Sequence, residues 1–153
     1  MSEPALPSQP TGSELRVWRS FLGAHARVLR CLEAELLAEQ RLSVVSYDVL
    51  VQLAETPDRR LRMAELADRV LLSRSGVTRL VDRLERAGLV SRHRVAADGR
   101  GVIAELTPAG LDRLRNASRT HLAGVVRHFV ARFEPQELAQ FGELCERLAE
   151  PAG

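Results

Sequence analysis

The chain of 153 residues contains no lysine, two cysteines and only 4% aromatic residues. Without lysine, neither Schiff-base catalysis nor a Walker-type phosphate-binding lysine is available. Cys31 and Cys145 form no Cys-x-x-Cys pair, so zinc-ribbon and thioredoxin-like sites have no support. The sequence also lacks a Gly-rich phosphate loop, a nucleophile elbow and a cluster of metal ligands. We therefore predict that the protein is not an enzyme and uses no cofactor or metal.

Long apolar runs are missing as well. No stretch of about 18 apolar residues occurs, so we predict neither a transmembrane helix nor a membrane partner. The first residues include three prolines but lack the basic start and apolar core of a signal peptide. We expect residues 1–12 to form a disordered tail. Together these features favour a cytoplasmic protein.

The charge is unevenly distributed along the chain. All 22 basic residues are arginines, and the net charge is +2. Residues 59–100 hold 11 arginines and five acids, whereas the rest of the chain holds 11 arginines and 15 acids. A basic middle between acidic ends indicates that the middle meets a polyanion. A solvated basic face is the alternative interpretation.

The most regular apolar pattern lies near the N-terminus. Spacings of three and four, sustained for about three heptads, predict a helix over about residues 13–39 that is roughly 40 Å long. Its stripe consists of Leu15, Trp18, Leu22, His25, Leu29, Leu32 and Leu36. Such a helix is longer than a small core needs, so we expect the stripe to pack against a second copy in a homodimer.

Three shorter helices are predicted next. Apolar spacing indicates a helix over about residues 45–55 and another around residues 63–70. Ser73 is a suitable N-cap for a third, and Gly88 is placed to end it.

A hairpin and two further helices complete the predicted order. Residues 89–95 and 102–106 alternate as two strands. A capping threonine and a first-turn proline then start a long helix expected over residues 107–133, and Pro135 opens the last helix.

The helix after Ser73 carries the strongest functional signal. Two short helices joined by a tight turn are typical of a helix-turn-helix, and the second helix here has one apolar face and one polar face. Guanidinium groups bind guanine edges and phosphates, and a helix N-terminus favours a phosphate. The candidate DNA-contacting residues on this helix are Ser73, Arg74, Ser75, Thr78, Arg79, Arg83 and Arg86.

The hairpin supplies a second basic group. Arg92 and Arg94 alternate along its first strand and so face the same side. Arg100 follows the turn at Asp98 and Gly99, where an arginine suits a narrow minor groove. A basic hairpin beside a recognition helix is typical of a wing, and a solvated hairpin with scattered charge is the alternative.

Two segments resemble the MarR family of winged-helix regulators. They are LRMAELADRVLLSRSGVTRLVDRLERAGLVSR, residues 61–92, and DGRGVIAELTPAGLDRL, residues 98–114. The resemblance, which extends over about residues 13–148, includes the order of the elements. It implies that the first, fifth and sixth helices form a dimer interface.

The family's wing motif, Asp-x-Arg, is matched by Asp98-Gly99-Arg100. The resemblance implies that Arg100 enters the minor groove and that Asp98 orients a basic neighbour.

These observations predict a mainly α fold with a small β-hairpin wing, that is, a winged helix-turn-helix with long N- and C-terminal dimerisation helices. The DNA-binding region would comprise residues 43–106, and the dimerisation region residues 13–42 and 107–150. The predicted partners are double-stranded DNA, a second copy of the chain and a small-molecule effector.

The predicted function is sequence-specific transcriptional regulation by a repressor that a small, anionic aromatic ligand releases from a palindromic operator. The ligand is implied by the resemblance, because members of the family release DNA on binding such molecules. Trp18, His25 and Tyr47 are the candidate pocket residues, since a urate-responsive branch has a tryptophan in its first helix. Packing is the alternative for Trp18, and a hydrogen-bonded structural role is the alternative for His25.

Other interpretations stay open at this point. The chain could be a non-responsive or architectural DNA-binding dimer, a protein-interaction dimer, or a redox-responsive regulator that uses Cys31. A reactive cysteine needs exposure and a lowered pKa, and the position of Cys31 within the first helix favours packing. His121 and His128 are seven residues apart, whereas a helical zinc pair is usually four apart.

Overall fold

The computed structural model describes residues 9–70, 72–95 and 101–151. It has a mainly α fold with one small antiparallel sheet, as the sequence predicts. The helices are α1 (Gly12–Gln40), α2 (Val44–Ala54), α3 (Met63–Arg69), α4 (Arg74–Arg86), α5 (Pro108–His128), the 3-10 helix η1 (Val130–Arg132) and α6 (Pro135–Ala149). The strands are β1 (Arg60–Arg62), β2 (Val90–Arg94) and β3 (Val102–Leu106).

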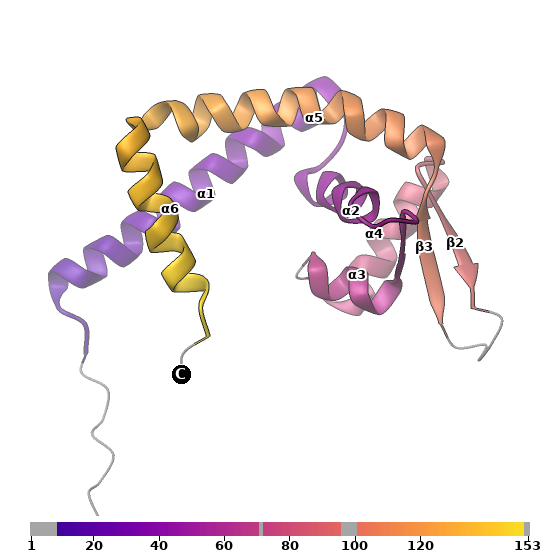
Figure 1. Ribbon diagram of the computed structural model, residues 1–153, viewed down its shortest axis with the longest axis horizontal. Helices are drawn as coiled ribbons and strands as arrows, with labels where there is room; N and C mark the ends of the chain where they lie inside the picture. The colour runs from indigo at the N-terminus through magenta and orange to yellow at the C-terminus, as the bar shows by residue number, and fades with distance from the viewer. Residues whose placement is uncertain (1–8, 71, 96–100, 152–153) are drawn as a thin grey trace, which may run out of the picture.

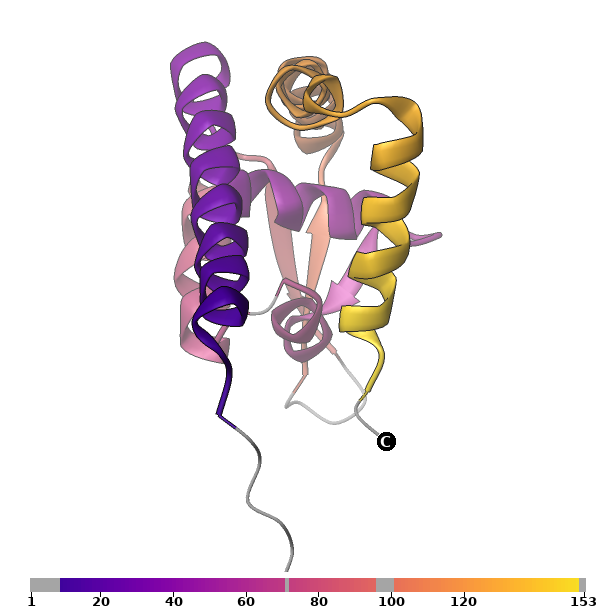
Figure 2. The same cartoon turned by 90° about the vertical axis from the view of Figure 1, so that its left-hand side faces the viewer.

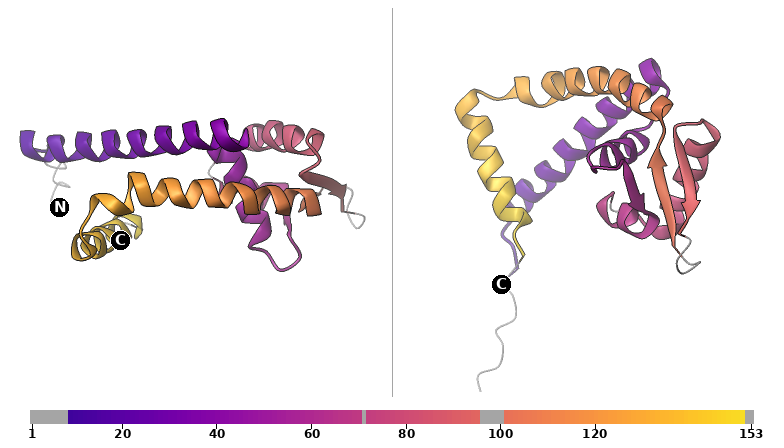
Figure 3. Two further views of the ribbon diagram at one scale, coloured as in Figure 1. Left: turned by 90° about the horizontal axis from the view of Figure 1, so that it is seen from above. Right: turned by 45° about the vertical axis from the view of Figure 1, so that its right-hand side comes forward.

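Two long helices form the frame of the molecule. Helix α5 runs along the top of Figure 1, and α1 packs along it. Helices α2 to α4 and the sheet gather at one end of α5, whereas α6 descends from the other end (Figure 1). Figure 2 shows α1 and α6 standing apart on either side of α5. Figure 3 (left) shows α1 and α5 lying alongside each other, with their chains running in opposite directions.

Local sequence signals begin and end these helices. Thr11 and Glu14 form a capping box at the start of α1, and Arg41 ends that helix in the left-handed region at φ 51°. The Ser73 side chain accepts a hydrogen bond from the Gly76 backbone N–H at the start of α4. Gly88, at φ +75°, adopts a backbone conformation that favours glycine just beyond α4. The predicted caps of α4 are thus confirmed.

The predicted end of α5 is wrong. We expect that helix to reach Phe133, but it stops at His128, and the chain then turns through η1. The turn brings the rings of Phe129 and Phe133 against Phe141 of α6, with ring centroids 5.7 and 5.5 Å apart. Contacts among these partly buried aromatic rings stabilise the turn.

Strand β1 is an addition that the sequence did not predict. It pairs antiparallel with β3, which therefore lies in the centre of a three-stranded sheet ordered β1-β3-β2. Three residues are too few to show an alternating pattern.

The buried core lies under the sheet and short helices. Leu36 of α1, Leu50 and Leu53 of α2, Leu66 of α3 and Val81 of α4 are each fully buried in one continuous cluster. This cluster fixes α3, α4 and the sheet against the end of the α1–α5 frame.

The far end of the frame leaves large apolar side chains in solvent. Trp18 is 55% exposed, Leu122 is 59% exposed and Leu148 is 73% exposed. Exposed apolar area of this kind marks an interaction surface. Among the described residues, no helix is both long and apolar enough to cross a membrane.

Candidate nucleic-acid interface

Helix α4 is anchored by one apolar face. Val77, Leu80, Val81 and Leu84 are between 0% and 4% exposed, as the helical pattern predicts. Full burial of such a side chain contributes roughly 1.5–3 kcal/mol. The rotation of α4 about its own axis is therefore set by the core, and the opposite face is held outward.

The outward face of α4 consists of exposed hydroxyl and guanidinium groups. Two of its hydroxyls have local partners: Ser73 accepts a hydrogen bond from the Gly76 backbone N–H, and Thr78 donates one to the Arg74 carbonyl oxygen. The arginines of α4 make no ion pair with any residue that the structure describes. The exposed residues are Ser73, Arg74, Ser75, Thr78, Arg79, Arg83 and Arg86.

The first hairpin arginine, Arg92, pairs with two acidic residues of α4. The Arg92 guanidinium lies 2.5 Å from a carboxylate oxygen of Asp82 and 3.0 Å from one of Glu85. The other Glu85 oxygen accepts a hydrogen bond from the Arg92 backbone N–H at 3.0 Å. We call these three residues the wing clamp, because they join β2 of the wing to α4.

The positive charge of Arg92 is compensated within the wing clamp by two acidic side chains. The hydrogen bond from Arg92 holds the pKa of Glu85 below its usual value, and the hydrogen bond with Glu85 raises that of Arg92. The Arg92 side chain is only 26% exposed. The guanidinium is therefore already engaged, and its geometry suits positioning of the wing.

The next hairpin arginine, Arg94, is exposed at the end of β2. Asp98 and Arg100, at the predicted wing tip, lie outside the described residues. On the sheet, Glu105 of the central strand pairs with both edge strands, reaching Arg60 at 3.2 Å and His93 at 3.0 Å.

The three candidate pocket residues do not meet in one site. Trp18 packs against Phe21, with ring centroids 6.0 Å apart, and stays largely exposed. Tyr47 is buried near the other end of the frame, where its hydroxyl lies 3.2 Å from Ser118 Oγ. Only His25 of the three lines a cavity, described next.

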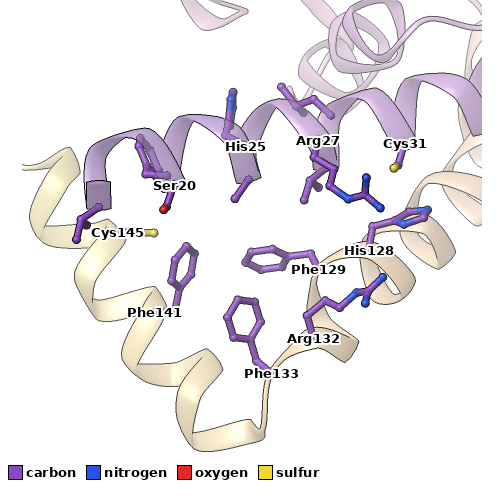
Figure 4. Close-up of a pocket in the computed structure, with 15 residues that line it drawn as sticks. Ser20, His25, Arg27, Cys31, His128, Phe129, Arg132, Phe133, Phe141 and Cys145 are labelled. Atoms are coloured by element: carbon purple, nitrogen blue, oxygen red, sulfur yellow. The ribbon is translucent and has the colours of Figure 1, made fainter. Parts of the chain in front are cut away.

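A cavity of about 760 Å³ lies between α1, the end of α5, η1 and α6. Figure 4 shows the rings of Phe129, Phe133 and Phe141 beneath α1, with Ser20 and Cys145 toward one end of the cavity. Cys31 also lines the cavity, nearer its opposite end (Figure 4). This cavity could not be predicted from the sequence, because it depends on the turn after α5.

The α1–α5 contact contains a second ionic cluster. Glu35 of α1 lies 2.6 Å from Nε2 of His128 and 2.7 Å from Nη1 of Arg127. The hydrogen bond with His128, and then that with Arg127, holds the pKa of Glu35 below its usual value. His128 thus has a structural partner that crosses between the two long helices.

His121 has a different environment on the same helix. Its ring lies 4.4 Å from that of Tyr47, and its Nδ1 is buried with no partner among the described residues. Burial lowers the pKa of His121, and nearby Asp48 opposes this effect. No group of three potential metal-ligating side chains occurs within the part of the chain that the structure covers.

Comparison with known proteins gives consistent matches. A profile of the MarR family matches residues 42–101. The chain is similar to the HTH-type transcriptional repressor YetL of Bacillus subtilis (strain 168), with 31% identity over 115 residues that span 73% of this chain and 69% of the relative.

Two solved structures extend the similarity to almost the full chain. Sco3205, a MarR family transcriptional regulator from Streptomyces coelicolor in complex with DNA, has a TM-score of 0.89 and 35% identity and covers 96% of this chain and 92% of its own. AbsC, a MarR family transcriptional regulator from the same organism, has a TM-score of 0.84 and 32% identity and covers 93% and 95% respectively. The similarity therefore includes the long helices as well as the sheet and α4.

Proposed function

The chain belongs to the MarR family of DNA-binding transcriptional regulators, and we propose that it is a homodimeric repressor that leaves a palindromic operator when it binds a small molecule. The observation that carries the proposal is the outward face of α4. Several exposed arginines stand there without ion pairs among the described residues, on a helix whose rotation the core fixes. Such a face is complementary to the floor of a major groove.

In this proposal α4 is the recognition helix. Arg79, Arg83 and Arg86 contact base edges and phosphates, while Ser73, Arg74, Ser75 and Thr78 bring the N-terminal end of α4 to the phosphate backbone. That the similar protein Sco3205 was solved in complex with DNA supports this docking.

The wing is the second contact. Arg94 lies at its exposed end, and Arg100 enters the minor groove with Asp98 orienting a basic neighbour. Arg92 holds the wing on α4 through the wing clamp and does not itself bind DNA.

The homodimer is supported by the apolar side chains left exposed on the frame. Trp18, Leu122 and Leu148 are each more than half exposed, and a second copy packed on α1, α5 and α6 would cover them. Two-fold symmetry would place two copies of α4 in successive major grooves, about 34 Å apart. Residues 43–106 are then the DNA-binding region, and residues 13–42 and 107–150 the dimerisation region.

Repression is supported by the name of the similar protein YetL, a transcriptional repressor. Release by a small molecule requires that the ligand bind the conformation unable to bind DNA more tightly than the DNA-bound one. His25 and the apolar cavity beside α1 are one candidate site, and the Tyr47–His121 contact is another. We assign Trp18 to packing in the dimer interface.

Selection of duplexes from a random DNA library by the purified protein tests the proposal. A two-fold palindrome with half-sites about ten base pairs apart would support it. Salt-sensitive binding without an enriched motif would instead favour an architectural DNA-binding dimer. A thermal-shift screen of anionic aromatic compounds, followed by DNA titrations, tests the ligand: binders that leave DNA affinity unchanged would contradict release.

Substitution of the wing-tip arginine tests the minor-groove contact. Arg100→Ala should weaken DNA binding and lower the slope of log affinity against log salt by about one unit, because one cationic contact is lost. The measurement is a fluorescence-anisotropy titration at several salt concentrations. An unchanged affinity and slope would reject the wing-tip role.

A further inference from the structure

Strand β1 brings two arginines to the sheet from a distant part of the chain. Arg60 and Arg62 flank Leu61, which is buried, and both are exposed. Since alternate residues of a strand point to opposite faces, both arginines lie on the outer face of the sheet. The pairing of Arg62 with Ile103 places Arg62 next to the start of β3, at the wing end of the sheet.

The two arginines differ in their surroundings. The Arg60 guanidinium lies 3.2 Å from the Glu105 carboxylate, so its charge has a partner. Arg62 makes no ion pair with any residue in the described ranges. Within the described part of the chain, one face of β1 thus carries one arginine with an ion-pair partner and one without, two residues apart.

The Arg62 side chain reaches across the base of the wing. A methyl group placed on Gly101 would lie 2.8 Å from Nη1 of Arg62 and 3.1 Å from a methyl carbon of Val95. Val95 and Gly101 are joined by a backbone hydrogen bond of 2.9 Å, which closes the described part of the hairpin. The absence of a side chain at Gly101 leaves room for the guanidinium there.

We propose that Arg62 is a further phosphate-contacting residue of the DNA interface, supplied to the base of the wing by β1. Across the sheet, Arg62 is in register with Ile103 and, beyond it, His93. With no ion-pair partner among the described residues, its guanidinium adds to the positive field that a polyanion meets. The proposal rests on the docking of α4 and the wing described above. Arg62 contributes affinity without sequence choice, since a phosphate contact carries no base information.

The magnitude follows from counterion release. Loss of one phosphate contact lowers the slope of log affinity against log salt by about 0.9. If the remaining contacts are unchanged, this slope corresponds to about eightfold weaker binding at 0.1 M salt.

The test compares Arg62→Gln with the matched variant Arg60→Gln, using the full chain and a duplex of random sequence. Arg62→Gln should show the reduced slope and the eightfold loss, and Arg62→Lys should retain the slope, because a phosphate accepts a point charge. Arg60→Gln should keep the wild-type slope. Thermal unfolding of each variant checks that the fold is retained.

An unchanged slope in Arg62→Gln would overturn the proposal, and so would equal losses in Arg62→Gln and Arg60→Gln, because charge alone would then explain both. Arg79→Ala, measured in parallel, separates this failure from failure of the proposed docking. If Arg79→Ala weakens DNA binding and Arg62→Gln leaves it unchanged, only the role of Arg62 is rejected. If neither variant changes binding, the docking itself is wrong.

Discussion

The wing clamp leads us to expect a change in DNA affinity opposite to the change that charge alone predicts. Neutralising an acidic side chain next to a DNA-binding surface should raise affinity for DNA if charge alone matters. Asp82 and Glu85 lie on α4, the proposed recognition helix, yet both pair with Arg92 of the wing. We therefore expect the double variant Asp82→Asn/Glu85→Gln to bind DNA more weakly than wild type.

The size of the effect follows from the exposure of the clamp. Its three side chains are between 26% and 40% exposed, so solvent screens each ion pair. Pairs of this kind contribute about 0.2–1 kcal/mol each. The two pairs and the Glu85 hydrogen bond to the Arg92 backbone together give about 1–2 kcal/mol. A shift in wing orientation can cost no more than this, so affinity should fall by up to about fivefold to 30-fold.

Anisotropy titrations with one duplex at one salt concentration measure the effect, and urea unfolding measures the accompanying loss of stability. Asp68→Asn is the matched control, because exposed Asp68 of α3 makes no ion pair with a described residue. It should leave affinity unchanged or slightly raised. Tighter DNA binding by the double variant would refute the clamp and return Arg92 to the set of candidate DNA contacts.

Three other predictions concern packing, pH and assembly. Gly110→Ala should destabilise the fold by about 1–3 kcal/mol in urea unfolding, because the new methyl group would clash with the Leu89 carbonyl oxygen. Gly142→Ala is the control and should not destabilise the fold, because no atom lies within 4 Å of its new methyl group. Burial lowers the pKa of His121, so below about pH 6.5 this side chain binds a proton more readily in the unfolded chain than in the folded one. The free energy of unfolding should therefore hold above that pH and decline below it. A His121→Gln variant with the same decline would contradict this. Leu144→Glu/Leu148→Glu should sediment as a folded chain of 17.0 kDa while wild type sediments at twice that mass, and a wild-type monomer at micromolar concentration would contradict the dimer.

Much of the fold is local and could be predicted from sequence. The caps at Ser73, Gly88 and Thr107 act within a few residues, so their chemistry is visible without any tertiary contact. The buried face of α4 likewise follows from helical spacing alone.

Features that depend on distant contacts could not be predicted in the same way. Strand β1 exists because β3, about 40 residues later, supplies its hydrogen bonds. The early end of α5 depends on Phe129 and Phe133 packing on α6. Both are tertiary effects that override local preference.

The residues of the candidate site likewise divide into those that local sequence predicts and those that depend on distant contacts. Exposure of Arg79 and Arg86 follows from the helical wheel, and the structure agrees. Arg92 alternates with Arg94 just as a DNA-facing residue would, but its acidic partners are brought to it by the packing of β2 on α4. Residue type and strand alternation therefore identify the basic region, while the acidic partners of Arg92 become visible only in the fold.

We propose above all that two copies of α4 read base sequence. The most direct test is the ratio of affinities for a selected palindrome and for a scrambled duplex of equal length, measured for wild type and Arg79→Ala at one salt concentration. We expect a wild-type ratio of at least about 10³, and we expect Arg79→Ala to lower this ratio by about 1–3 kcal/mol of discrimination. A wild-type ratio near one, or a ratio that Arg79→Ala leaves unchanged, would contradict it.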